Sequence, residues 1–145
     1  MTVNYGKLVK QACNQMNRAM DEYARASGLT GTQMSIIDFI GSKSAVLQRD
    51  IETEFNIQRS TASVLLQRME ARELVTRQAV AGDARQKAVR LTPKAERLHE
   101  MVAVYIAKQQ SAMTSEFTPA ECATFVRMLQ YFIQLNHGEQ APSEP

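Results

Sequence analysis

The sequence is poor in the residues that build disulfide-linked or metal-centred proteins. It has no tryptophan and only two cysteines, Cys13 and Cys122, which are too few for a disulfide framework. Neither cysteine has a metal-ligand spacing around it, and His99 and His137 are equally isolated. We therefore expect no metal, no cofactor and a reducing, intracellular setting.

Long apolar runs are also missing. The uncharged apolar run at residues 102–107 is far shorter than the roughly 20 residues of a membrane span. The first fifteen residues carry Lys7 and Lys10 but no apolar core of a signal peptide. Catalytic patterns are equally absent, since there is no His/Asp/Ser or Cys/His constellation and no glycine-rich phosphate loop. These absences predict a cytoplasmic protein that is not an enzyme and has no membrane partner.

What is present fits one globular domain. The 145 residues are 44% apolar and 22% charged, enough to build a core and too apolar for wholesale disorder. The formal net charge is only +2, but residues 47–97 carry ten basic and seven acidic side chains, a local balance of +3. This excess, mostly arginine, is compatible with a nucleic-acid face.

Apolar spacing and capping signals predict a mainly helical chain. Steps of three and four predict a helix over 5–26 that ends at Ser27-Gly28, and Thr30 with Gln33 forms a capping box for a second helix to about residue 41. With Thr92 as N-cap and Pro93 at the first helical position, a long helix is expected to about residue 114. A second capping box at Thr118 starts the last helix, which closes near residue 137.

The middle of the chain has a different organisation. Two helical stretches, 48–55 and 59–72, are separated by Asn56, which suits a sharp turn because asparagine tolerates positive φ. Two β-prone pieces, 74–78 and 88–91, then flank a polar segment over 81–86 and predict a hairpin. Helix-turn-helix followed by hairpin is the order of a winged helix.

The predicted fold is therefore mainly α with a small β-hairpin wing, a winged helix-turn-helix joined to a helical dimerisation region. We expect a single domain over 1–145, with its DNA-binding part at 29–91. The segments 1–28 and 92–137 are expected to form the dimerisation part, because their apolar stripes exceed what a small winged helix can cover. A monomeric bundle, in which these helices fold back on their own protomer, is the alternative. Residues 138–145 are expected to form a flexible tail.

The sequence resembles the MarR family of bacterial regulators. The resemblance is carried by Leu29-Thr30 with Gln33, by the block 51–74, and by Asp83-Ala84-Arg85 followed by Leu91-Thr92. The family usually has glycine at the positions of Asn56 and Glu73, so the exit from the second helix of the pair is expected to be strained or differently shaped. It also often has a basic residue at the position of Val64.

Helical geometry divides the predicted recognition helix into two faces. With 100° per residue, Leu65, Leu66 and Met69 fall within about 60° of Ala62 and form the buried stripe. The opposite pole suits base edges, while arginines at the sides suit phosphates. A solvated polar face is the alternative for such a helix. Together with the wing, the predicted DNA-binding residues are Gln58, Arg59, Ser60, Ser63, Val64, Gln67, Arg68, Arg77, Asp83, Arg85 and Lys87.

The wing carries one cation of special interest. Arg85, at the expected wing tip, can reach the minor groove, where narrow A·T-rich stretches concentrate negative potential. Asp83 would be repelled by phosphate, and the resemblance implies that it pairs with an arginine and orients it. A plain turn at Gly82-Asp83 is compatible with this role.

The resemblance also implies a small aromatic or amphipathic effector between the dimerisation and DNA-binding parts. Methionine is adaptable enough for such a pocket, although a methionine stripe at helical spacing also reads as plain core. The candidate lining residues are Met16, Met20, Tyr23, Met34, Ile37 and Met101.

A cysteine-based redox sensor is an alternative, because one peroxide-sensing branch of the family has a reactive cysteine early in its first long helix. Here the second helix lacks that branch's supporting tyrosines, and only Lys10 or Arg18 offers Cys13 a positive charge. We therefore expect Cys13 to be a buried structural residue.

The sequence as a whole predicts a transcriptional regulator that binds a pseudo-palindromic site in double-stranded DNA as a homodimer. A repressor released by a small-molecule effector is the favoured form. A winged helix whose faces bind a partner protein instead of DNA is the alternative from another class.

Overall fold

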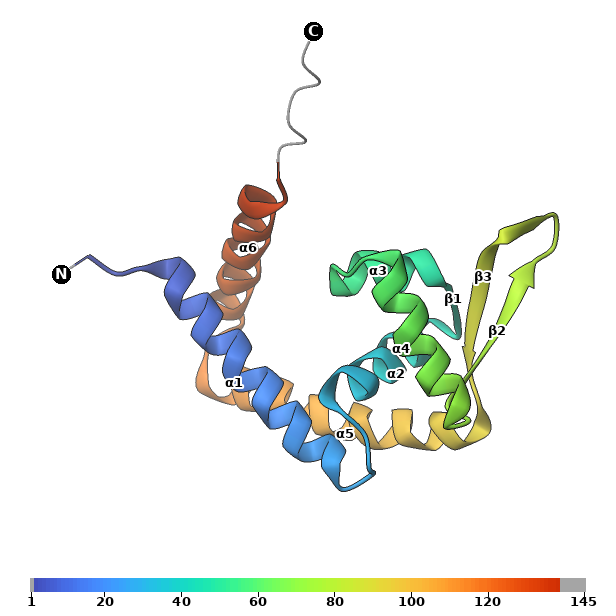
Figure 1. Cartoon of the computed structure of the whole chain (residues 1–145). Helices are drawn as coiled ribbons and strands as arrows, with labels where there is room; N and C mark the ends of the chain where they lie inside the picture. Colours follow the sequence, from blue (N-terminus) through green and yellow to red (C-terminus); the bar gives the residue numbers. More distant parts are fainter. Residues whose placement is uncertain (1, 139–145) are drawn as a thin grey trace, which may run out of the picture. The chain divides into compact units, whose positions relative to one another are not determined.

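Helices dominate residues 2–138, which are the residues that this computed structural model describes (Figure 1). The elements, in chain order, are α1 (Tyr5–Arg25), α2 (Gly31–Lys43), β1 (Ala45–Leu47), α3 (Gln48–Phe55), α4 (Arg59–Ala71), β2 (Val75–Val80), β3 (Asp83–Leu91), α5 (Pro93–Glu116) and α6 (Pro119–Asn136). They fall into two compact units, one that ends at Ala103 and one that begins at Val104. The predicted tail lies outside the described residues except for Gly138.

The predicted helix boundaries are set by local hydrogen bonds. At the start of α2 the Thr30 hydroxyl accepts from the Gln33 N–H at 3.1 Å, and the Gln33 side chain accepts from the Thr30 N–H at 3.1 Å. Thr118 and Glu121 make the same reciprocal pair at the start of α6. The hydrogen bond that the Glu121 carboxylate accepts from the Thr118 backbone N–H lowers the pKa of Glu121, and a hydrogen bond with the Thr118 side chain lowers it further. Both predicted capping boxes are confirmed.

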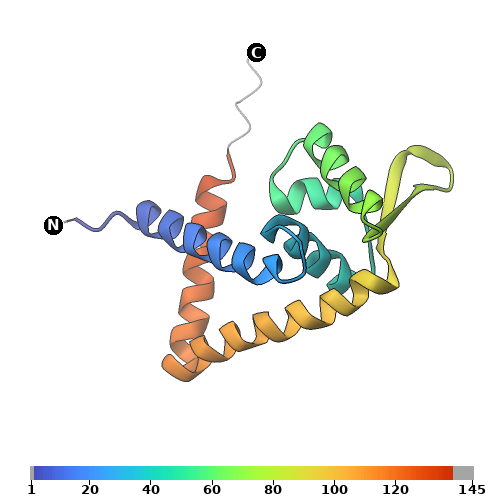
Figure 2. The same ribbon diagram turned by 60° about the horizontal axis from the view of Figure 1, so that its bottom comes forward.

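The helix-turn-helix is formed by α3 and α4, which lie against each other (Figure 2). Asn56 follows α3 in the left-handed region, with φ of +52°, as its residue type predicts. The Ile57 N–H then donates to the Glu52 carbonyl at 3.0 Å, which closes the end of α3. Ile51 on α3 and Leu66 on α4 are fully buried, so the pair is fixed by apolar packing as well as by the turn.

The exit from α4 is made without glycine. Glu73 takes a φ of +59°, the conformation that glycine adopts most easily, and the Leu74 N–H donates to the Met69 carbonyl at 2.9 Å. Thr92 secures this exit, because its hydroxyl donates to the Glu73 carbonyl at 2.6 Å and its backbone N–H donates to the Leu74 carbonyl at 3.1 Å. The same hydroxyl accepts from the Ala95 N–H at 3.2 Å and so caps α5.

The sheet has three antiparallel strands in the order β1-β3-β2. Val46 pairs with Val89 and Val75 pairs with Leu91, and the three valines are all buried. The two long strands run closer to the turn than predicted, so Ala81 and Gly82 alone lie between them, with Gly82 at φ of +85°. Strand β1 was not predicted, and it makes the wing part of a sheet rather than an isolated hairpin.

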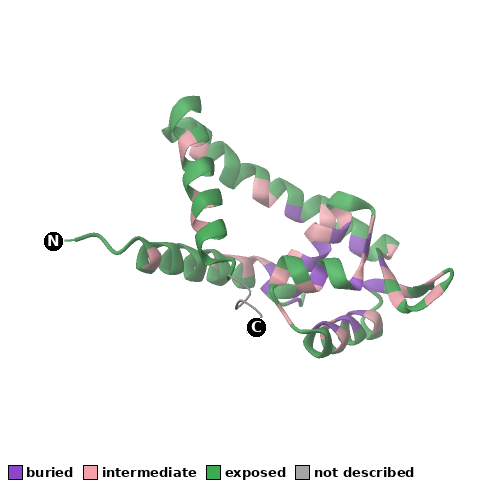
Figure 3. Cartoon of the chain, turned by 90° about the horizontal axis from the view of Figure 1, so that it is seen from above, coloured by how far each residue is buried: buried purple, intermediate pink, exposed green. Residues whose placement is uncertain are grey.

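The core lies in the first unit, where α2, α3, α4 and the sheet meet (Figure 3). Met34, Ile36, Ile37 and Ile40 of α2 are fully buried there. In the second unit no residue of α6 is buried within the single chain. Within residues 2–138, no helix is long and apolar enough to cross a membrane. Mainly helical content with a small winged sheet confirms the predicted fold class.

Candidate nucleic-acid interface

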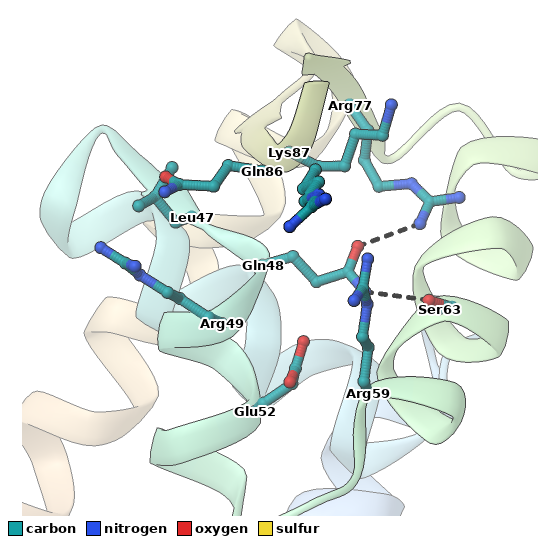
Figure 4. Close-up of a pocket in the computed structure, with 10 residues that line it drawn as sticks. Leu47, Gln48, Arg49, Glu52, Arg59, Ser63, Arg77, Gln86 and Lys87 are labelled. Atoms are coloured by element: carbon teal, nitrogen blue, oxygen red, sulfur yellow. Dashed lines mark hydrogen bonds between the residues drawn. The ribbon is translucent and has the colours of Figure 1, made fainter. Parts of the chain in front are cut away.

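A concave surface opens where the start of α3, the first turns of α4 and the wing come together (Figure 4). Its volume is about 320 Å³, and we call it the cationic hollow. Its lining includes five cationic side chains and one carboxylate, that of Glu52. The full lining is Leu47, Gln48, Arg49, Glu52, Arg59, Ser63, Arg77, Arg85, Gln86 and Lys87. A hollow of this charge attracts polyanions, because clefts lined by one sign of charge concentrate counter-ions.

The α4 helix presents the two faces that its spacing predicts. Ala62, Leu66 and Met69 are fully buried on one side. The opposite side is open to solvent, and Val64 there is 47% exposed although it is apolar. The predicted base- and phosphate-facing residues that are exposed are Gln58, Arg59, Ser60, Val64, Gln67 and Arg68. Their contact with DNA stays a prediction.

Two of the predicted contact residues are held by other side chains of the protein. Arg77 on β2 donates through Nε to the Glu70 carboxylate at 2.8 Å, and its Nη2 lies 2.6 Å from the same carboxylate oxygen in an ion pair. The Arg77 side chain is 20% exposed. Its remaining nitrogen, Nη1, donates to Gln48 Oε1 at 3.1 Å, and Gln48 Nε2 donates to Ser63 Oγ at 2.9 Å. Arg77 and Ser63 are thus part of a chain of bonds that joins β2, α4 and α3.

Arg85 lies on β3 rather than in a loop at the tip, because the strand begins at Asp83. The Asp83 carboxylate accepts a bond from the backbone N–H of Arg85 at 3.0 Å. None of the ion pairs found among residues 2–138 includes Asp83, so the predicted pairing with a guanidinium is corrected to a bond with the backbone. The Arg85 side chain is exposed and, like Lys87, lines the cationic hollow.

Sequence reasoning missed Gln48, Glu70 and Arg49. Gln48 is a buried polar residue, 7% exposed, and its partners are 15 and 29 residues away in sequence. Glu70 contacts Arg77 seven residues later, across the exit from α4. No local spacing signals such pairs. Arg49 lines the hollow next to Gln48, and its place in the basic stretch 47–97 is the one signal that pointed to it.

The six candidate effector residues have different environments. Met34 and Ile37 are fully buried in the core, whereas Met16 and Met101 are 62% and 50% exposed. Met20 and Tyr23 are half-buried. Neither the cationic hollow nor the cavity of the second unit is lined by any of the six. An effector cleft built from them stays a prediction.

Cys13 is exposed on α1, so the expectation of a buried cysteine is wrong for the single chain. The Asn17 side chain donates to its sulfur at 3.7 Å. Ala24 is the one buried residue of α1 in the single chain, so the same protomer provides no packed environment around Cys13. Among residues 2–138 no group of three His, Cys, Asp or Glu side chains is arranged to hold a metal ion.

Apolar side chains are exposed in both units. On α1 they include Tyr5, Leu8 and Met16. In the second unit, the end of α5 and α6 form a groove of about 620 Å³, which we call the apolar groove. It is lined mainly by Met113, Phe117, Cys122, Phe125 and Met128.

Known proteins are similar to this chain in sequence and in fold. A profile described as the MarR family matches residues 27–86. The crystal structure of the transcription regulator MarR from Oenococcus oeni PSU-1 is 43% identical, aligns 90% of this chain with 99% of its own, and has a TM-score of 0.78. The S. aureus MepR–DNA complex is 20% identical over 92% of this chain and 98% of its own, with a TM-score of 0.81. YwoH, an uncharacterised HTH-type transcriptional regulator of Bacillus subtilis (strain 168), is 23% identical over 126 residues, 87% of this chain and 91% of that protein.

Proposed function

The chain belongs to the MarR family of transcription regulators, and on that premise we propose that it binds operator DNA as a homodimer. Family membership makes it a regulator rather than an enzyme. The observation that carries the proposal is the cationic hollow, which adjoins the exposed face of α4. The related MepR of S. aureus forms a complex with DNA, which supports the same ligand for this chain.

In this proposal α4 enters the major groove. Ser60, Val64 and Gln67 face base edges, where glutamine can bond adenine N6 and N7 and valine can meet a thymine methyl group. Arg59 and Arg68 meet phosphates beside the groove. Arg85 on the wing reaches the neighbouring minor groove, with its backbone held by Asp83.

We further propose that exposed apolar surfaces of the terminal helices are covered by a second copy of the chain. α6 has no buried residue in the single chain, and Ile133 and Leu135 near its end are 67% and 64% exposed. A monomer seldom leaves so many large apolar side chains in water. Two-fold symmetry would then present two α4 helices to half-sites about 34–36 Å apart.

Repression that is relieved by a small aromatic or amphipathic effector completes the proposal. Its support is the family membership and the methionines of α1, α2 and α5, since methionine adapts to ligands of varied shape. The setting that we propose is the cytoplasm, where the regulated DNA would lie.

The test begins with selection of bound sequences from random duplex DNA by the intact protein. Affinities for the selected duplex and for a scrambled one are then measured at several salt concentrations. Gln67→Ala should lose about 1–3 kcal/mol on the selected duplex and little on the scrambled one. Arg68→Ala should weaken both, with a log–log salt slope shallower by roughly two per dimer, about 0.9 for each lost phosphate contact.

Arg18→Ala is the matched control, because Arg18 is an exposed arginine on α1 that pairs with Glu22 and does not line the hollow. It should leave both affinities unchanged. If the intact protein selects no sequence and binds duplex DNA no better than it binds an acidic protein, the family fold serves a protein partner here and the proposal is wrong. Sedimentation as a 16.3 kDa monomer that still binds the selected duplex tightly would contradict the dimer.

A further inference from the structure

Four side chains are joined by hydrogen bonds in a continuous line. The line runs from Glu70, near the end of α4, to Ser63, which lies earlier on α4 and lines the cationic hollow. Glu70 accepts from Arg77, Arg77 donates to Gln48, and Gln48 donates to Ser63. Figure 4 shows the last two bonds, with Gln48 between the wing and α4. The line begins and ends on α4 but passes through β2 and α3.

The direction of every bond in this line is fixed by chemistry. A guanidinium has donors only, so the Gln48 atom that faces Arg77 must be the carbonyl Oε1. The amide nitrogen therefore faces Ser63 and must donate to it. Glu70 in turn holds Arg77 at 2.6 Å, which keeps the guanidinium in place.

Ser63 is consequently left with a proton that cannot point at Gln48. Its oxygen accepts from the amide, so the hydroxyl hydrogen turns in one of the other directions. Other helical hydroxyls here donate to the carbonyl one turn earlier, as Thr53 does to Arg49 at 3.0 Å. Among the hydrogen bonds of residues 2–138, none is donated by Ser63 to such a carbonyl. Ser63 lines the cationic hollow, so its proton is available to whatever enters.

We propose that Gln48, held by Arg77 and Glu70, presets Ser63 as a hydrogen-bond donor to an acceptor on bound DNA. This inference rests on the proposed DNA-binding function and names what one position of α4 recognises. The acceptor is a phosphate oxygen or an acceptor on the major-groove edge, such as guanine N7 and O6, adenine N7 or thymine O4. Gln48 is a positioning residue in this proposal, because it acts through Ser63 and need not touch the DNA.

One substitution reverses the direction of the hydrogen bond to Ser63 and keeps the bond to Arg77. In Gln48→Glu, an ionised carboxylate has acceptors only, so it still accepts from Arg77 but now also accepts from the Ser63 hydroxyl. The Ser63 proton is then used in the bond to the carboxylate, so Ser63 has only lone pairs left for the DNA. It can no longer donate to the acceptor on the DNA. The added negative charge also repels phosphate, and this second effect does not depend on Ser63.

A double-mutant cycle separates the two effects. The four proteins are the wild type, Gln48→Glu, Ser63→Ala and the double variant, each measured on the duplex selected by the wild type and on a scrambled duplex at one salt concentration. Ser63→Ala should weaken binding a few-fold to tenfold for each half-site, and Gln48→Glu at least as much. The double variant should be no more than about twofold weaker than Ser63→Ala. Gln48→Met is the matched control for the positioning residue, because it is similar in length, uncharged and unable to fix the hydroxyl either way. It should weaken binding less than Gln48→Glu does.

The outcomes are distinct. Losses limited to the selected duplex identify a base acceptor, and equal losses on both duplexes identify a phosphate, so either pattern supports the donor role. If Gln48→Glu weakens the Ser63→Ala protein by the same factor as the wild type, the carboxylate acts by charge alone and the inference is overturned. Ser63→Ala binding with unchanged affinity also overturns it. If the wild type selects no duplex, the proposed function itself is refuted. If Gln48→Glu has the same effect with and without Ser63→Ala, this inference alone is refuted.

Discussion

Gly41→Ala provides a stringent test of the packing between α2 and α5. A methyl carbon built on Gly41 would lie 2.6 Å from Nδ1 of His99 and closer still to two ring carbons. Real contacts of this kind are well over 3 Å, so either the imidazole or a helix must move. Nε2 of that ring lies 4.0 Å from the Asp38 carboxylate, so a shift of the ring also disturbs this contact.

Two opposing terms set the change in the free energy of unfolding that Gly41→Ala causes. Alanine is favoured over glycine in a helix by about 1 kcal/mol, so an unobstructed Gly41→Ala would stabilise the protein. Forcing an extra methyl group into a packed contact costs about 1–3 kcal/mol. The expected result is a net loss of up to about 2 kcal/mol in the free energy of unfolding, opposite in sign to the usual effect of this substitution.

The assay is urea denaturation followed by circular dichroism at one fixed protein concentration, because association would otherwise shift the midpoint. His99→Ala supplies the matched background. There the methyl group meets no ring, and Gly41→Ala should raise stability by up to about 1 kcal/mol. If Gly41→Ala stabilises the protein equally in both backgrounds, the close approach of Gly41 and His99 does not exist in solution.

Three further predictions concern α4, the wing and α1. Glu73→Gly should raise the free energy of unfolding by up to about 1 kcal/mol, because relief of a left-handed φ worth about 1–2 kcal/mol exceeds the extra chain entropy of about 0.5–1 kcal/mol. An unchanged or lower urea midpoint would contradict this. Arg85→Ala should lose about 1–3 kcal/mol of DNA binding, and Asp83→Ala should also weaken binding although it removes a negative charge, because Asp83 holds the Arg85 backbone. Tighter binding by Asp83→Ala in a gel shift would refute that role. Cys13→Ser should leave DNA binding and its response to peroxide unchanged, because no ion pair or cation is held at this sulfur among the described contacts. Peroxide-induced release that disappears in Cys13→Ser would show instead that the thiol is a sensor.

Features coded by neighbouring residues were predictable from the sequence. The capping boxes at Thr30 and Thr118 each involve residues three apart, and the turn at Asn56 depends on one residue's tolerance of positive φ. The two faces of α4 follow from the helical period alone. The unusual exit at Glu73 was expected for a different reason, namely that the resembling family usually has glycine at this position, and the sequence could not say that glutamate would adopt glycine's conformation.

Features that depend on distant residues were not predictable. Strand β1 is only three residues long, and its pairing with β3 joins positions more than forty residues apart. Gln48 was missed because its partners lie on α4 and β2, and the bonds that hold Arg77 to Glu70 and Gln48 exist only once the chain has folded. The exposure of Cys13 depends on what covers α1, which no local pattern records.

The hydroxyl of Thr92 has a consequence for how operators can vary. It bonds the exit of α4 and caps α5, while its backbone N–H bonds the residue that precedes β2. These bonds tie α4 to the wing, so in the proposed complex we expect a constant interval, within a protomer, between the bases that α4 reads and the groove that the wing reaches. If the proposed dimer binds two half-sites, natural operators should differ in the spacer between the half-sites and share one layout inside each half-site.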